Sequence, residues 1–134
     1  MRAFVLVFCL LAATACDEKS PVGPTVPLNE RFTLARGEVA RVEGADLRVQ
    51  FVEVTGDSRC PADAVCIQGG DALVHVRVID DSTTAYELHT GDTSKAAVTH
   101  QQVRIALVDL QPFPFSSRTI AQDEYRATFT VTRP

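Results

Sequence analysis

The segment 57–71 holds the densest set of chemically active residues in the chain: three aspartates, one arginine and two cysteines. An arginine guanidinium can bind a carboxylate or a phosphate through two parallel hydrogen bonds, and Arg59 is the candidate for such a contact. The three carboxylates, Asp57, Asp63 and Asp71, could instead collect around a calcium ion, which prefers oxygen ligands. The types and spacing of these residues therefore indicate a possible ligand site in this segment.

A purely structural role explains the same residues equally well. Asp57 would cap a turn, and Arg59 would pair with Asp57 or with Asp63. The two glycines at 69 and 70 would permit backbone conformations that other residues avoid. We keep Asp57, Arg59 and Asp63 as candidate binding residues, and the sequence assigns no metal and no cofactor.

Cys60 and Cys66 are expected to form a disulfide. The chain has four cysteines, and the other two, Cys9 and Cys16, lie in the N-terminal export region described below. An even pair in an oxidising compartment favours a disulfide. The enclosed loop is short, so the bridge contributes about 2 kcal/mol and chiefly fixes the shape of the loop. The alternative is a redox or metal pair, but redox cysteines usually stand two residues apart, and structural zinc needs two further ligands.

A second candidate site lies in the segment 111–117, Gln-Pro-Phe-Pro-Phe-Ser-Ser. Prolines at alternate positions prevent ladder pairing, so Phe113 and Phe115 belong to an extended connection. One interpretation is that the two rings cover an open end of the fold. If both rings are exposed, they form an apolar patch that suits a protein partner or the ring of a glycan.

The sequence shows no convincing set of catalytic residues. His75 and His89 fall on outward positions, and a hairpin closed near Ser82 would place them directly opposite each other, close enough to share a metal. Ser58 beside Asp57 lacks the Gly-x-Ser-x-Gly elbow of a serine nucleophile. The paired carboxylates at 80–81 and 123–124 lie in turn-like segments. The chain is therefore not expected to be an enzyme.

Apolar residues alternate with polar ones from residue 31 onward, which predicts strands. The expected strands lie near 31–34, 38–43, 47–54, 72–79, 86–88, 96–100, 103–110 and 125–132. The alternation changes phase after Phe51 and at Val108, which indicates in each of those strands either a bulge or a passage of the strand between two sheets. Seven to eight short strands without a convincing helix predict an all-β fold, a single antiparallel β-sandwich of immunoglobulin-like or Greek-key type, over residues 29–134.

The N-terminus has the pattern of an export signal. One positive charge at Arg2 is followed by eleven apolar residues, 3–13, a run too short to span a bilayer but suited to a signal peptide over residues 1–15. Residues 13–16, Ala-Thr-Ala-Cys, resemble the lipobox of bacterial lipoproteins, although leucine is usual where Ala13 stands. The resemblance implies a lipid on Cys16. The alternative is an ordinary signal peptidase site that leaves Cys16 as a free thiol.

Residues 16–28 are expected to form the lipidated cysteine and a flexible tether, because prolines and polar residues dominate this segment. The chain as a whole carries a formal net charge of −4. An acidic surface does not attract a polyanion, so no nucleic-acid partner is expected.

A second resemblance covers most of the domain. The run 57–61, Asp-Ser-Arg-Cys-Pro, with the second cysteine, the glycine before the next strand and the Tyr-containing strand 124–132, resembles small bacterial lipoproteins of uncharacterised function. The resemblance implies an all-β domain at the cell envelope and brings no activity with it.

These observations predict an exported protein that is lipid-anchored to the cell membrane or the outer membrane and acts as a non-catalytic binding or structural module. Its partners would be the membrane, through the N-terminal lipid, and a protein or glycan of the envelope. The alternative is an inhibitor of a hydrolase that presents the disulfide-pinned loop 57–66. An inhibitor must hold that loop exposed and ordered, so a loop packed flat against the sheet would count against it.

Overall fold

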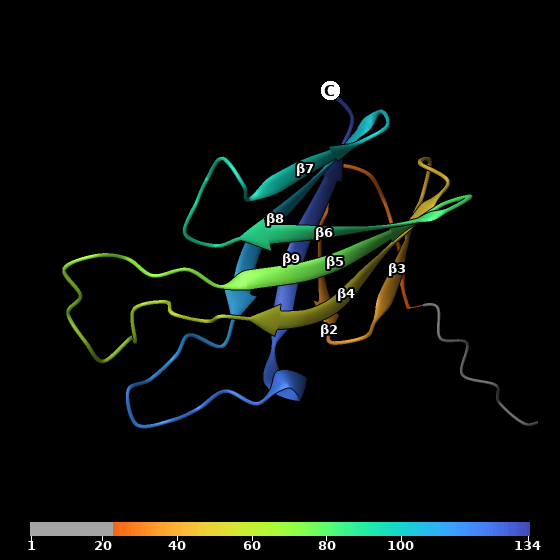
Figure 1. Ribbon diagram of the computed structural model, residues 1–134. Coiled ribbons are helices and arrows are strands. Elements are labelled where there is room, and N and C mark those ends of the chain that lie inside the picture. Colours follow the sequence, from red (N-terminus) through yellow and green to blue (C-terminus); the bar gives the residue numbers. More distant parts are fainter. Residues whose placement is uncertain (1–22) are drawn as a thin grey trace, which may run out of the picture.

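The strands of alternating apolar and polar residues form two packed β-sheets (Figure 1). The computed structural model describes residues 23–134, and within that range it contains nine strands and one 3-10 turn. The strands are β1 (Thr25–Val26), β2 (Arg31–Ala35), β3 (Val39–Val42), β4 (Leu47–Thr55), β5 (Leu73–Ile79), β6 (Thr83–His89), β7 (Ala97–His100), β8 (Val103–Gln111) and β9 (Arg126–Thr132), and the turn η1 is Gln122–Glu124. The expected all-β sandwich is confirmed.

Consecutive strands are neighbours in most of the structure. One sheet has the order β1-β3-β4-β5-β6, and the other has the order β2-β9-β8-β7. All pairs are antiparallel except β1 with β3. The result is a meander from β3 to β6, a second from β7 to β9, and β2 placed against β9. The alternation of residue types could not specify this order.

The core forms where the inward positions of the two sheets meet. In β9 the residues Ala127, Phe129 and Val131 are fully buried, while the alternate threonines are partly exposed. Phe129 packs against Phe51 of the opposite sheet with ring centroids 6.3 Å apart. Burial of each such side chain stabilises the fold by about 1.5–3 kcal/mol, so the two-residue period of the sequence translates directly into the sandwich.

Each change of phase is a bulge, the first of the two alternatives that the sequence left open. The register of β4 against β5 shifts between Phe51 and Glu53, and that of β8 against β9 shifts between Leu107 and Asp109. Each extra residue moves the following apolar side chains back to the inner face, so Val54 and Leu110 are buried. The bulges thereby extend the core to the ends of β4 and β8, where the candidate site begins.

The domain starts earlier than residue 29, the boundary expected from the sequence. Thr25 and Val26 form β1, which pairs in parallel with Arg41 and Val42, and the side chain of Val26 is buried. The prolines on either side of this strand conceal it from sequence analysis. Cys16 and the lipobox lie outside the described residues, as does most of the expected tether. No helix within residues 23–134 is long and apolar enough to cross a membrane.

A polar contact ties the two sheets together at the turn between β5 and β6. His100, at the end of β7, is buried, and its Nε2 lies 2.7 Å from Oδ2 of Asp80 in that turn. Its Nδ1 lies 2.9 Å from the hydroxyl of Tyr86 on β6. The hydrogen bond with His100, together with the backbone N–H of Ser82, lowers the pKa of Asp80 from 3.8 to about 2.

This contact predicts a specific acid sensitivity. Because the folded-state pKa of Asp80 lies below its ordinary value, its carboxylate stabilises the fold above about pH 4, and that contribution is lost as the pH falls toward 2. We expect Asp80→Asn to lower the Tm at pH 7 and to flatten the fall of Tm between pH 4 and pH 2, as measured by thermal unfolding. Asp81→Asn, on the same turn, should keep the wild-type profile. Identical profiles for Asp80→Asn and wild type would contradict this role.

Candidate functional site

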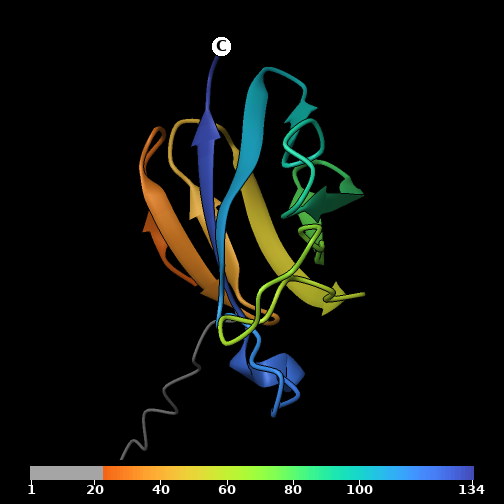
Figure 2. The same cartoon turned by 90° about the vertical axis from the view of Figure 1, so that its left-hand side faces the viewer.

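Two loops that leave the same side of the sandwich form one unit (Figure 1). One follows β4 and spans 56–72, and the other follows β8 and spans 112–121. The backbone N–H of Ala62 donates to the carbonyl of Pro114 at 2.8 Å, and that of Ser116 donates to the Asp63 carboxylate at 2.9 Å. The Ser116 hydroxyl also donates to Asp63, and these hydrogen bonds lower the pKa of that carboxyl. Figure 2 shows the two loops adjacent in the perpendicular view.

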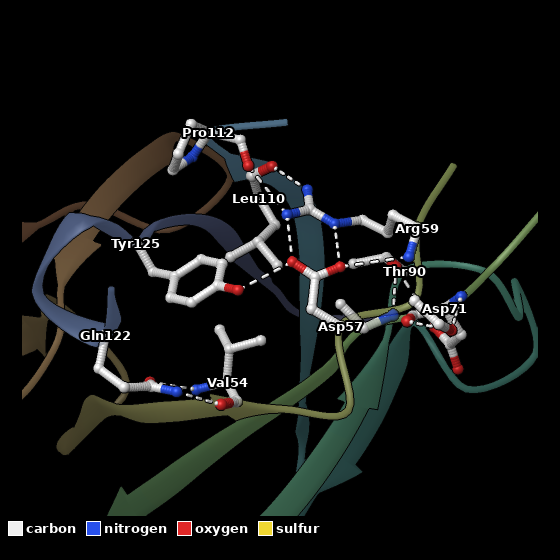
Figure 3. Close-up of polar contacts among 11 residues, drawn as sticks. Val54, Asp57, Arg59, Asp71, Thr90, Leu110, Pro112, Gln122 and Tyr125 are labelled. Carbon is white, nitrogen blue, oxygen red and sulfur yellow. Dashed lines mark hydrogen bonds and ion pairs between the residues drawn. The ribbon is translucent and has the colours of Figure 1, made fainter. Parts of the chain in front are cut away.

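Arg59 organises the base of both loops (Figure 3). Its Nε and Nη2 donate to the two carboxylate oxygens of Asp57 at 2.9 and 2.8 Å. Its Nη1 donates to the carbonyl of Leu110 at 2.6 Å, and its Nη2 donates to that of Pro112 at 2.9 Å. The side chains of Arg59 and Asp57 are only 8% and 11% exposed. One guanidinium therefore joins the 56–72 loop to the end of β8.

Asp57 is further held by Tyr125, whose hydroxyl donates to its carboxylate at 2.8 Å. Burial by itself would raise the pKa of Asp57, but the hydrogen bonds from Arg59 and Tyr125 outweigh it and lower the pKa. Burial, with the hydrogen bond to Asp57, raises the pKa of Tyr125 to about 12. Asp57 is thus held ionised and Tyr125 protonated across the neutral pH range, which suits a permanent structural contact.

The short strand β7 explains why the carbonyls of Leu110 and Pro112 take their hydrogen bonds from Arg59. Strand β7 pairs only with residues 103–106 of β8, so it does not reach the last residues of that strand. Arg59 supplies the donors that a neighbouring strand would provide to Leu110 and Pro112. Gln122 acts similarly at the end of β4, where its side-chain amide bonds both the N–H and the carbonyl of Val54 (Figure 3).

The two ends of the 56–72 loop are closed tightly. Ser58 N–H donates to the carbonyl of Asp71 at 2.7 Å, and Asp71 N–H donates to the Ser58 hydroxyl at 3.1 Å. A Cβ atom at Gly70 would lie 1.5 Å from the carbonyl oxygen of Ser58, so only glycine fits. Burial would raise the pKa of Asp71, but hydrogen bonds from Gly91 N–H and His89 lower it. The loop is therefore ordered from its base.

The structure separates the candidate residues predicted from the sequence into two groups. Asp57 and Arg59 pair with each other inside the protein, as the structural alternative proposed, and their hydrogen-bonding groups face inward. The aspartates do not converge: Asp57 faces Arg59, Asp63 faces Ser116, and Asp71 faces His89. Among residues 23–134 no three His, Cys, Asp or Glu side chains form a group that could hold a metal ion.

The exposed part of the site is apolar. Val65 and Ile67 are fully exposed, at 103% and 104% of their reference area, and Phe113 and Phe115 are half exposed at 49% and 51%. We call these four residues the apolar tip. The predicted disulfide between Cys60 and Cys66 is present and anchors the residue between Val65 and Ile67. Sequence reasoning missed the two aliphatic residues, although branched apolar side chains on both sides of a cysteine in a polar loop were a visible signal.

A hollow of about 290 Å³ lies beside the apolar tip. Its lining includes the apolar residues Leu107, Val108 and Phe113 and the polar residues His89 and Asp109. The guanidinium carbon of Arg59 lies 5.5 Å from the ring centroid of Phe113, so a cation–π contact steadies the exposed ring. A partner could place a single side chain in a hollow of this size.

His75 and His89, which one possible register of the hairpin would place opposite each other, are not cross-strand partners. His75 pairs with Glu87 across β5 and β6, and His89 pairs with Leu73, so the register differs by two residues from one in which the histidines face each other. His75 Nε2 lies 2.6 Å from the hydroxyl of Thr55, and His89 Nδ1 lies 2.5 Å from Asp71. The turn at Asp80–Ser82 fixes this register through hydrogen bonds that the residue pattern does not reveal.

No family model, curated protein or solved structure matches this chain significantly. The interpretation of the site therefore rests on its own geometry.

Proposed function

We propose that this protein is a non-catalytic binding module, held at a bacterial cell envelope by a lipid on Cys16, whose apolar tip contacts a protein partner. The observation that carries the proposal is the complete exposure of Val65 and Ile67 on an ordered, disulfide-closed loop. Neither side chain contributes to the core, so folding alone gives no reason for a branched aliphatic residue at either position.

The apolar tip has the features of the centre of a protein interface. The centres of protein interfaces are rich in aromatic and other apolar anchors, and exposed side chains of this kind on two loops joined by hydrogen bonds suit that role. The loop is also fixed before binding by the disulfide, by Arg59 and by the contacts of Asp63 with Ser116. A preorganised loop loses little conformational entropy when it binds, which favours affinity.

The chemistry favours a protein over a glycan. A glycan site needs hydrogen-bonding groups directed at sugar hydroxyls, whereas Val65 and Ile67 offer none. Arg59 and Asp63, charged residues of the same loop, are engaged within the protein.

The binding proposal predicts a cross-link that depends on the apolar tip. A photo-reactive amino acid at Gln68 should capture one defined envelope protein in living cells, and Val65→Ser with Ile67→Ser should abolish that product. Both residues are fully exposed, so the double variant should unfold within about 0.5 kcal/mol of wild type. The same probe at Thr83, the exposed first residue of β6, should give no such product. A product that survives the double substitution would contradict the proposal.

The anchor proposal predicts the loss of lipid on Cys16→Ser. An alkyne-labelled fatty acid fed to the producing bacterium should label the wild-type protein but not this variant, which should appear in the soluble fraction. A variant with both Cys60 and Cys66 replaced by serine should keep the label. Labelling that persists in Cys16→Ser, or that is absent from wild type, would show that the protein is not anchored this way.

A further inference from the structure

We infer that His89 is a pH-dependent clamp on the loop that carries the apolar tip: the base of the loop is held tightly when the imidazole is protonated and is loosened when the proton is lost. This inference rests on the proposed function, because it concerns the regulation of the same apolar tip. His89 ends β6, and its side chain is only 15% exposed. Its ring lies between the carboxylates of Asp71, near the end of the 56–72 loop, and Glu87, on β6.

Both ring nitrogens of His89 face a carboxylate oxygen. Nδ1 lies 2.5 Å from Oδ2 of Asp71, and Nε2 lies 3.3 Å from Oε1 of Glu87. A neutral imidazole carries one N–H and the imidazolium carries two, whereas an ionised carboxylate only accepts. The protonated ring can therefore satisfy both contacts, and the neutral ring must present a nitrogen lone pair to one of the two carboxylates. The arrangement is complete only when His89 is charged.

Asp71 connects the ring of His89 to the base of the loop. The backbone carbonyl of Asp71 accepts from the N–H of Ser58 at 2.7 Å, and its own N–H donates to the Ser58 hydroxyl at 3.1 Å. Its second carboxylate oxygen, Oδ1, accepts from the Thr90 hydroxyl and the Gly91 N–H, and these bonds do not depend on the charge of the ring. Loss of the imidazolium charge should therefore loosen the base of the loop without opening it.

The second histidine on this face of the sheet has no such requirement. His75 Nε2 lies 2.6 Å from the hydroxyl of Thr55, just before the loop begins. A hydroxyl can donate or accept, so this contact can form with either charge state of the ring. The same nitrogen is 3.8 Å from Glu87, which is too far for a hydrogen bond. His75 is therefore a matched control for His89.

The other charged groups around His89 come from three elements. The loop 90–96 contributes Asp92 and Lys95, and the backbone N–H of His89 donates to the carbonyl of Lys95 at 3.1 Å. Arg59, in the 56–72 loop, and Asp109, on β8, line the same hollow as His89. Strand β5 places an uncharged residue opposite it.

The direction of the pH effect follows from the charges beside the ring. Histidine is the side chain that ordinarily changes charge between about pH 5 and pH 8. Burial would raise the pKa of Asp71, but hydrogen bonds from Gly91 and His89 lower it, and hydrogen bonds from Ser94 lower the pKa of Asp92. Both aspartates thus stay ionised in this range. The contacts of the imidazolium are present at the acidic end and are lost as the pH rises.

Hydrogen exchange at the amides of Ser58 and Asp71, measured on the detergent-solubilised mature protein at about pH 5.5 and pH 8, tests the clamp. Each rate is divided by the intrinsic rate at the same pH to give a protection factor. Wild type should lose about 10-fold in protection at the higher pH, as expected for the loss of one charge-assisted hydrogen bond. His89→Gln should have the lower protection at both pH values, and His75→Gln should keep the wild-type change.

Glu87→Gln provides a second variant that does not depend on the folding of His89→Gln. Its amide can donate to the neutral ring of His89, so protection should change less with pH than in wild type. Three results would overturn the inference: equal protection at the two pH values in wild type, a wild-type change that persists in His89→Gln, or a full wild-type change in Glu87→Gln.

The cross-link from Gln68 separates this inference from the proposed function. Repeated in isolated envelope vesicles, it should be stronger at about pH 5.5 than at pH 8, and His89→Gln should remove the difference. If the product forms equally at both pH values in wild type, the binding function stands and its regulation by His89 is wrong. If the product is absent at both, the binding function fails, and hydrogen exchange alone decides whether the clamp exists.

Discussion

Replacement of Arg59 with alanine is expected to lower the free energy of unfolding by about 3–5 kcal/mol, the usual effect of removing one partner of a buried ion pair. The substitution would remove two hydrogen bonds from the Asp57 carboxylate. It would also remove the hydrogen bonds that Arg59 donates to the carbonyls of Leu110 and Pro112. An effect of this size is a large fraction of the stability of a small domain. The loops should also lose their common anchor.

Urea unfolding monitored by circular dichroism measures this effect. Arg59→Lys should recover only a small part of the loss, because an ammonium group cannot hold a carboxylate and two carbonyls in the same fixed fork. Arg77→Ala removes an exposed arginine from β5 and should change the free energy by no more than about 0.5 kcal/mol. If Arg59→Ala unfolds with the same midpoint as Arg77→Ala, the network is not a support of the fold.

The second large effect is expected at Gly70. A methyl group there would lie 1.5 Å from the Ser58 carbonyl oxygen and 2.3 Å from its carbonyl carbon, so the backbone at the base of the loop must move. We expect Gly70→Ala to destabilise the protein by about 3 kcal/mol, the upper part of the usual range for overpacking. The hydrogen bonds between Ser58 and Asp71 should be the first to open.

The neighbouring glycine provides a matched control. A Cβ at Gly69 would meet no atom within 4 Å, so Gly69→Ala should leave stability within about 0.5 kcal/mol of wild type. Hydrogen exchange at the amides of Ser58 and Asp71 should speed up in Gly70→Ala and stay unchanged in Gly69→Ala. Equal exchange rates in the two variants would mean that the base of the loop is not closed as the structure describes.

Arg59→Ala and Gly70→Ala also bear on function, because they alter the residues that support the apolar tip and leave the apolar tip itself unchanged. If the tip binds as a preorganised surface, loosening its base should weaken the cross-link from Gln68 even in the fraction that remains folded. Substitution at the tip should have the opposite pattern, with binding lost and stability kept. Comparison of the two kinds of variant separates the residues that hold the site from those that make contact.

The sequence was sufficient for the features that depend on local order. Alternation of apolar and polar residues identified every strand except β1, and changes of phase located both bulges. The two cysteines left after the expected export region predicted the disulfide. These features follow from a period of two residues or from a simple count, and the physics that produces them acts over a few neighbouring positions.

The candidate site depended on contacts between distant parts of the chain. Arg59 and Leu110 are 51 residues apart, and no periodicity indicates that the carbonyl end of β8 lies beyond the reach of β7. Asp57 and Arg59 therefore looked available for a ligand, although the folded chain directs them inward. The partners of Asp63 and Asp71 were hidden for the same reason.

Residue pattern by itself thus determined that this chain folds as a disulfide-bearing β-sandwich with two unusual loops. Only the tertiary structure decided the strand order, the inclusion of Val26 in the core, and the roles of charged and apolar residues in the loops. The physical reason is that exposure in an irregular loop is set by whatever packs beside it. Val65 and Ile67 became the candidate contact surface because the neighbouring loop braces the first half of their own loop and leaves both side chains uncovered.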